Sequence, residues 1–301
     1  MQIMTSIIPI VLTVGLGFAL ESRRHMDVRA LSTVTIYVLL PCLIFHSLST
    51  TELTLGEAFP IVAVGVIDLV ALWLMGKAIS RVRHFDRDDE SFFLLTTMFL
   101  NAGNMGMPIS LYAFGQRGLD LAVIGVLVMN LSMNTVAIYY ASRHRGGRRA
   151  AVRTVFSLPT IYAAASALLL RNVFGVSLPG FLLDPIRLLG YAAIPLAQLL
   201  LGIQLAKART RVSTHLAGVI VPNFVRLLLS PAIAFAAVAV LGVSGITAKV
   251  AILVSAMPTA ANIVIYTTEF NLQPRRAATA VFTSTVASFV TLSCLLFLLS
   301  P

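Results

Sequence analysis

The stretch NAGNMGMPI, residues 101–109, places two asparagines, two glycines and a proline inside an otherwise apolar segment. The residues before it read SFFLLTTMFL and those after it read SLYAFG. Proline removes a backbone donor and clashes with the preceding helical turn, and glycine lowers the cost of leaving helical geometry. The stretch therefore predicts a break in the middle of a hydrophobic helix.

The composition around this break is that of a membrane protein. Of the 301 residues, 58% are hydrophobic and only 11% are charged, whereas soluble proteins carry about 25% charged residues. The apolar residues come in runs of about 20, the length that a helix needs to cross a bilayer. We expect an all-α polytopic membrane protein with a single membrane domain over residues 1–301. The net charge of +10 lies mostly in short connections between the runs, which argues against a nucleic-acid partner.

Ten candidate spans can be placed along the chain, and they are residues 3–20, 31–49, 59–79, 91–114, 120–141, 158–175, 186–206, 216–241, 247–269 and 277–299. Most of the 22 Lys and Arg residues lie in the connections that follow the odd-numbered spans. Cytoplasmic loops carry an excess of Lys and Arg. The pattern predicts a multi-pass protein of the cytoplasmic (inner) membrane with both termini outside.

The two halves of the chain carry matching prolines. Pro41 and Pro195 lie 154 residues apart, and Pro108 and Pro258 lie 150 residues apart. Similar offsets at two landmarks predict a repeat of five plus five helices, and five is odd, so the second repeat is inverted, as in many transporters. The expected division is repeat one at 1–142, a basic linker loop at 143–157 and repeat two at 158–301.

The second half has its own break, MPTAAN, with Pro258, Thr259 and Asn262. Unwound backbone at membrane depth is tolerated where it is buried in protein or lines a cavity. Half-helices starting near Ile109 and Ala260 would direct their N-terminal amides at the membrane midplane, which suits an anion such as a small carboxylate; their partners' C-terminal carbonyls could equally hold a cation. The candidate substrate-binding residues at the two broken helices, spans four and nine, are Asn101, Gly103, Asn104, Gly106, Pro108, Pro258, Thr259 and Asn262.

Four further polar residues lie within spans. Asn130 and Asn134 share one face of span five because they are four residues apart, and they either line the site or bridge helices. Asp68 and Arg226 are ionisable residues near the centres of spans three and eight, and such residues are functional candidates in a membrane. Asp68 is either a proton-coupling carboxylate or half of a permanent ion pair. Arg226 would pair with Asp68, bind the substrate anion or snorkel toward the cytoplasm.

At these residues the sequence resembles the auxin efflux carrier family of transporters. The family pattern N-x-G-N-x-G-x-P is matched from Asn101 to Pro108, and a proline followed shortly by asparagine is matched by Pro258 and Asn262. The resemblance implies a fold related to the bile acid/sodium symporters, with scaffold spans 1, 2, 6 and 7, and transport-domain spans 3–5 and 8–10 that move as an elevator. It also implies that the broken helices four and nine cross at the substrate site. It also implies an organic-anion substrate and a possible homodimer through the scaffold. The chain lacks the long cytoplasmic insert of the plant carriers, so it looks like the short prokaryotic form.

These features predict a secondary transporter of a small organic anion, for example a dicarboxylate such as malonate or malate, driven by a proton gradient or the membrane potential. A sodium-coupled symporter and a passive channel are the alternatives. The crossover offers Asn and Thr but no acid, which favours proton coupling or uniport over sodium coupling. No G-x-x-x-x-G-K-[ST] motif and no catalytic or metal-ligand spacing occurs in the sequence, so we expect neither an enzyme, a metal nor a cofactor.

Overall fold

The computed structural model describes residues 2–141, 158–175, 178–212 and 216–299, and these residues fold into helices without a β-strand. The helices of the first half are α1 (Gln2–Arg23), α2 (Val28–Val34), α3 (Leu40–Thr50), α4 (Leu55–Val82), α5 (Arg87–Met98), α6 (Met107–Ser132) and α7 (Ile138–Ala141). Those of the second half are α9 (Pro159–Asn172), α10 (Gly180–Arg209), α11 (Ala217–Phe224), α12 (Ser230–Val240), α13 (Gly245–Ser255), α14 (Asn262–Glu269) and α15 (Pro274–Leu299). Four π-helical turns join consecutive helices, and they are η1 (Thr35–Leu39), η2 (Ala102–Gly106), η3 (Met133–Ala137) and η4 (Val225–Leu229).

Seven helical segments of the described chain are long and apolar enough to cross a membrane. They are Ser6–Arg23, Val28–Thr50, Leu55–Val82, Ala102–Tyr140, Gly180–Arg209, Ala217–Val240 and Pro274–Leu299. The expected spans four and nine are each divided between two helices, α5 with α6 and α13 with α14, and α9 has only 14 residues. The loop expected after residue 114 is a break inside α6 at Gly115, whose φ of 68° is readily adopted by glycine.

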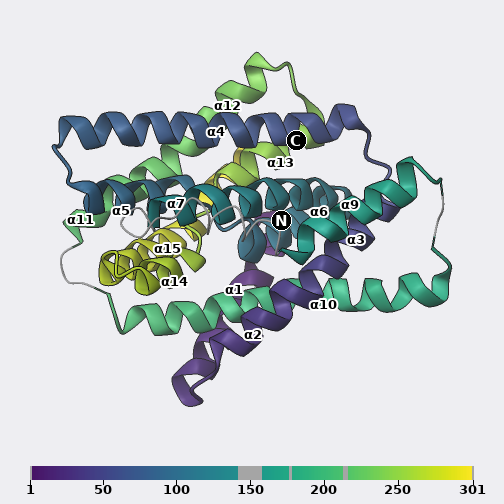
Figure 1. Cartoon of the computed structure of the whole chain (residues 1–301), viewed down its shortest axis with the longest axis horizontal. Helices are drawn as coiled ribbons and strands as arrows, with labels where there is room; N and C mark the ends of the chain where they lie inside the picture. Colours follow the sequence, from purple (N-terminus) through teal and green to yellow (C-terminus); the bar gives the residue numbers. More distant parts are fainter. Residues whose placement is uncertain (1, 142–157, 176–177, 213–215, 300–301) are drawn as a thin grey trace.

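The helices α4, α6 and α10 run along the length of the molecule (Figure 1). Figure 1 shows α4 and α10 along opposite edges, with α5 and α6 between them. α1 packs against α10 at two glycines, because a Cβ on Gly17 would overlap the Leu199 carbonyl and one on Gly202 would overlap that of Val14. Small residues allow such close approach of membrane helices.

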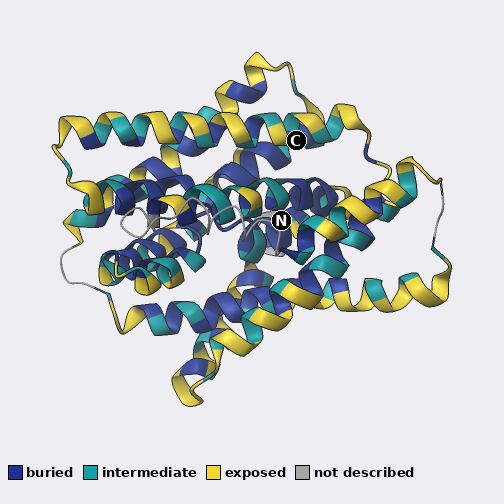
Figure 2. Ribbon diagram, viewed as in Figure 1, coloured by how far each residue is buried: buried dark blue, intermediate teal, exposed yellow. Residues whose placement is uncertain are grey.

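Burial divides the helices into inner and outer ones (Figure 2). Every residue of α5 from Ser91 to Met98 is buried, and so is nearly all of α13. The outer helices α4 and α10 instead expose large apolar side chains, such as Phe59 (69% exposed) and Leu188 (76% exposed). Exposed apolar surface of this extent is typical of a protein that contacts lipid.

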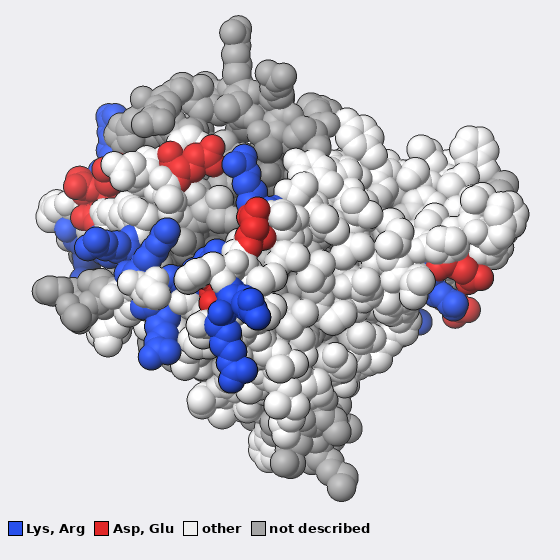
Figure 3. Space-filling view, turned by 90° about the horizontal axis from the view of Figure 1, so that it is seen from below, with Lys and Arg blue, Asp and Glu red and all other residues white. Residues whose placement is uncertain are grey.

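Charged side chains gather at the ends of the molecule. On the face shown in Figure 3, most Lys and Arg gather over one half, and a broad uncharged surface separates them from a small charged group at the other end. The last turns of α1 and α10 contribute Arg23, Lys207 and Arg209 at their ends. The basic linker predicted at 143–157 lies outside the described residues.

Candidate functional site

In the first half of the chain, the helix is interrupted before Pro108, the proline of the NAGNMGMPI stretch. Phe99 to Asn101 leave helical geometry, whereas Pro108 lies inside the helix that follows, directly after the π-helical turn η2. Asn101 caps the new helix by accepting a hydrogen bond from the Asn104 N–H at 3.3 Å. The half-helix therefore begins at Ala102, and the start expected near Ile109 is wrong.

The break in the second half spans 256–261, and α14 begins at Asn262, close to the start expected at Ala260. Unlike Pro108, Pro258 lies in the non-helical segment itself.

The two breaks are hydrogen-bonded to each other. Leu100 and Thr259 form an isolated antiparallel bridge. The Asn101 N–H donates to the Pro258 carbonyl at 2.8 Å, and the Ala260 N–H donates to the Phe99 carbonyl at 2.9 Å. Backbone groups that lack a helical partner at one break are thus hydrogen-bonded by the other break. This pairing removes the large cost of leaving them unpaired at membrane depth.

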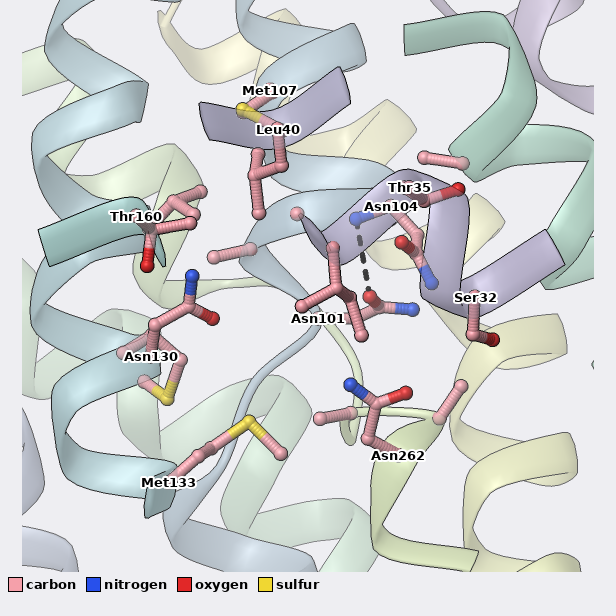
Figure 4. A pocket seen from close by; sticks show the side chains of 18 of the residues that line it. Ser32, Thr35, Leu40, Asn101, Asn104, Met107, Asn130, Met133, Thr160 and Asn262 are labelled. Atoms are coloured by element: carbon pink, nitrogen blue, oxygen red, sulfur yellow. Dashed lines mark hydrogen bonds between the residues drawn. The ribbon is translucent and has the colours of Figure 1, made fainter. Parts of the chain in front are cut away.

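A cavity of about 220 Å³ lies beside this crossover (Figure 4). Among its lining residues are six of the predicted substrate-binding residues, namely Asn101, Gly103, Asn104, Asn130, Asn134 and Asn262. Figure 4 shows Asn130 on α6 and Asn262 on α14 facing the space around Asn101. Five asparagine side chains from both halves of the chain therefore meet at one cavity.

The other four predicted residues lie outside the lining and support the crossover. Gly106 is buried against the Met257 side chain, and Pro108 is buried in the first turn of α6. The Pro258 carbonyl accepts from Asn101, and the Thr259 hydroxyl donates to the Thr96 carbonyl at 2.8 Å. Their contacts are structural.

The cavity also includes residues that sequence reasoning missed. They are polar side chains from other helices: Ser32, Thr35, Tyr37, Thr160 and Tyr266. A single hydroxyl in an apolar helix gives no pattern, so the sequence carried no signal for the serine and the threonines.

Several polar atoms at the cavity have no partner within the described chain. They are the Asn101 Nδ2, Ser32 Oγ and Thr160 Oγ1 atoms, all buried. Asn134 Nδ2, in contrast, donates to the Asn130 carbonyl at 2.8 Å. Buried polar groups are normally hydrogen-bonded, so the three unpaired atoms are available to a solute. No Asp, Glu, Lys or Arg is among the described lining residues.

Asp68 and Arg226 lie together in a separate buried cluster. Arg226 Nη2 is 3.4 Å from Asp68 Oδ2, and the two side chains are 0% and 3% exposed. A small cavity beside Asp68 shares Leu100 and Met129 with the large one. The ion pair thus lies behind the cavity wall and does not reach a solute in it.

The family model described as "Membrane transport protein" matches residues 2–296. The chain belongs to this family, the auxin efflux carriers.

Two archaeal relatives agree with that membership. An uncharacterized transporter of Methanocaldococcus jannaschii is 24% identical over 288 residues, covering 92% of this chain and 90% of the relative. An uncharacterized transporter of Methanothermobacter thermautotrophicus is 28% identical over 299 residues, covering 95% of each chain. The family and these relatives are transporters and not enzymes.

Proposed function

We propose that this family member is a secondary transporter that moves a small organic anion, such as the dicarboxylates malonate or malate, across the cytoplasmic membrane. The observation that carries the proposal is the uncharged, asparagine-rich cavity where the two helix breaks meet. Amide groups and hydroxyls donate hydrogen bonds to a carboxylate without a fixed counter-charge, so binding stays weak enough for release.

The helix ends at the cavity favour an anion over a cation. The helical segments beginning at Ala102 and Asn262 both start at the cavity lining. A helix N-terminus carries about half a positive charge and free N–H groups. Asn101 Nδ2 adds an unpaired donor. A volume of about 220 Å³ is below the ~300–1,000 Å³ of drug-sized ligand pockets, which fits a small solute.

We propose alternating access by an elevator motion within a ten-span, five-plus-five inverted repeat. In this assignment α5–α6 and α13–α14 correspond to spans four and nine. The scaffold is α1–α3 with α9 and α10, which pack on each other, and the transport domain contains α4, α5, α12 and α13, which also pack together. Between α6 and the scaffold, the Ser47 hydroxyl donates to Asp120 at 2.6 Å and the Tyr191 hydroxyl to Gln116 at 2.5 Å. A few such contacts can break and re-form.

The driving force would be the proton gradient or the membrane potential, with Asp68 as coupling carboxylate in the first case and as structural charge in the second. Both termini would lie outside, and the lipid-facing side of the scaffold would form any homodimer. The distribution of Lys and Arg supports the placement of the termini, and the family resemblance supports the scaffold assignment.

The test is uptake of labelled malonate, malate and an indole carboxylate into proteoliposomes, with and without a proton gradient. The variants are Asn104→Ala and Asp68→Asn. The matched control is Asn223→Ala, an asparagine outside the cavity that bonds to Thr283. We expect saturable carboxylate uptake that Asn104→Ala reduces and Asn223→Ala leaves nearly unchanged.

Other outcomes would overturn the proposal or decide the role of Asp68. Uptake in both Asn variants equal to the native rate would remove the cavity as the binding site. Flux that does not saturate would indicate a channel. Loss of proton dependence in Asp68→Asn would assign proton coupling to Asp68. Uptake that is independent of the gradient in the native protein and unchanged in Asp68→Asn would make Asp68 a structural charge.

A further inference from the structure

Arg226 lies fully buried (0% exposed) in η4, between the two broken helices. Its Nη1 donates to the Thr97 carbonyl at 2.9 Å and reaches the Met98 carbonyl at 3.5 Å. Its Nη2 donates to the Ser255 carbonyl and to the Ser230 hydroxyl, and it pairs with Asp68 at 3.4 Å. Every acceptor in this set is an oxygen.

The backbone acceptors have a common position in the fold. Thr97 and Met98 are the last residues of α5, and Ser255 is the last residue of α13. The last carbonyls of a helix have no partner within it and carry about half a negative charge. The helices that precede the two breaks, α5 and α13, therefore both direct their negative C-terminal ends at the Arg226 guanidinium.

Asp68 adds a full negative charge to the same place. The Ser230 hydroxyl lies 2.9 Å from its carboxylate and 2.8 Å from the Ser255 carbonyl, and these two acceptors share its one hydrogen. One carboxylate and two helix C-termini together carry about two negative charges, and a buried charge of this size needs a cation. The Arg226 side chain supplies one from within the chain.

We infer that Arg226 is a built-in cation at the crossover, in the position where a transporter with broken helices can bind a coupling metal ion. Half-helix C-termini and unwound carbonyls are ligands for Na⁺ in transporters of this architecture. Because the guanidinium already occupies these ligands, transport by this chain requires no sodium. The statement that transport requires no sodium rests on the proposed function. The statement that Arg226 fills a cation site does not.

The same geometry predicts what removal of the side chain does. Shortening Arg226 to alanine leaves the Asp68 carboxylate, the Ser230 hydroxyl and the Thr97 and Ser255 carbonyls around an empty volume. Such a set of hard oxygens suits Na⁺. Arg226→Ala therefore creates a sodium site, whereas Arg226→Met removes the charge but fills the volume and creates none.

The experiment measures thermal unfolding of the purified full-length protein in detergent, in NaCl and in choline chloride of equal ionic strength. We expect Na⁺ to raise the unfolding temperature of Arg226→Ala by at least about 2–4 °C, the effect of a ligand that binds the folded state. The native protein and Arg226→Met should show no difference between the salts. The control is Arg276→Ala, since Arg276 also pairs with a carboxylate, Asp89 at 2.6 Å, but is about one-third exposed; it should be indifferent to sodium.

Uptake in the same two salts gives a second readout. Native carboxylate uptake should agree within about twofold, and uptake by Arg226→Ala should be about tenfold higher in sodium, a coupling of ordinary size. If the native protein moves no carboxylate, the proposed function fails, but the thermal comparison still tests the inference.

Three results would overturn the inference. The first is sodium-dependent stability or uptake of the native protein. The second is a folded Arg226→Ala that responds to sodium no more than Arg226→Met. The third is a failure to purify Arg226→Ala in sodium while Arg226→Met folds. If neither variant folds, the response of the native protein to sodium decides.

Discussion

Thr259→Val should destabilise the protein by separating the two breaks. The Thr259 hydroxyl is completely buried and donates to the Thr96 carbonyl at 2.8 Å, in the last turn of α5. Valine has nearly the same shape but no donor, so the substitution leaves the Thr96 carbonyl unpaired inside the protein. An unsatisfied buried group costs about 1–3 kcal/mol. We expect the free energy of unfolding to fall by about that amount.

Thr267→Val is the matched control. Thr267 is also 0% exposed, and its hydroxyl donates at 2.8 Å to the Ile263 carbonyl inside its own helix, α14. A carbonyl within a helix already has a backbone donor, so the control should lose less than about 1 kcal/mol.

The assay is reversible unfolding by sodium dodecyl sulfate in mixed micelles, followed by circular dichroism. Equal losses in the two variants would refute the reasoning, because the cost would then belong to any buried threonine and not to the pairing of the breaks.

Three further perturbations follow from the contacts described. Gly202→Ala should cost about 1–3 kcal/mol of stability by overpacking α1 against α10, while Gly15→Ala, with open space around it, should be near neutral in the same unfolding titration. At the membrane edge, the hydrogen bond from Gln273 lowers the pKa of Asp89 below its usual 3.8. The Asp89 carboxylate therefore stabilises the folded protein above its usual pKa of 3.8. This stabilisation is lost as the pH falls through the lower pKa of Asp89 in the folded protein. The stability advantage of the native protein over Asp89→Asn should thus shrink from about pH 5 toward pH 3, and a constant difference would contradict the bond. Ser47→Ala, which removes a hydrogen bond between α3 and α6, should raise the turnover rate in the uptake assay if these helices separate during transport; unchanged turnover would show that the contact does not limit the motion.

The sequence predicted the two helix breaks and six of the residues that line the cavity, because proline, glycine and asparagine leave a local signature. It misjudged where the first half-helix begins. A proline within an apolar run either breaks a helix or is accommodated inside one, and Pro108 lies inside the helix that begins at Ala102. The position of unwinding depends on distant partners, since Arg226 and Thr259 take the carbonyls at the end of α5. A local pattern contains no information on them.

The charged pair shows a different limit. Asp68 and Arg226 stood out in the sequence as intramembrane charges, and their contact in the structure follows from the cost of burying either alone. The carbonyls that surround Arg226 carried no signal, because every residue has one. Likewise Ser32 on α2 and Thr160 on α9 reach the cavity through the packing of these helices on α10 and α3.

The bridge between Leu100 and Thr259 also has a consequence for biosynthesis. The two residues lie about 160 positions apart in the chain, and a ribosome adds about 5–20 residues each second. The first break is therefore synthesised on the order of 10–30 s before the second break, its hydrogen-bonding partner. During that interval the end of α5 lacks the donors that later pair with it. We expect the nascent first half to hold this region near water, or against the insertion machinery, until α13 has been synthesised.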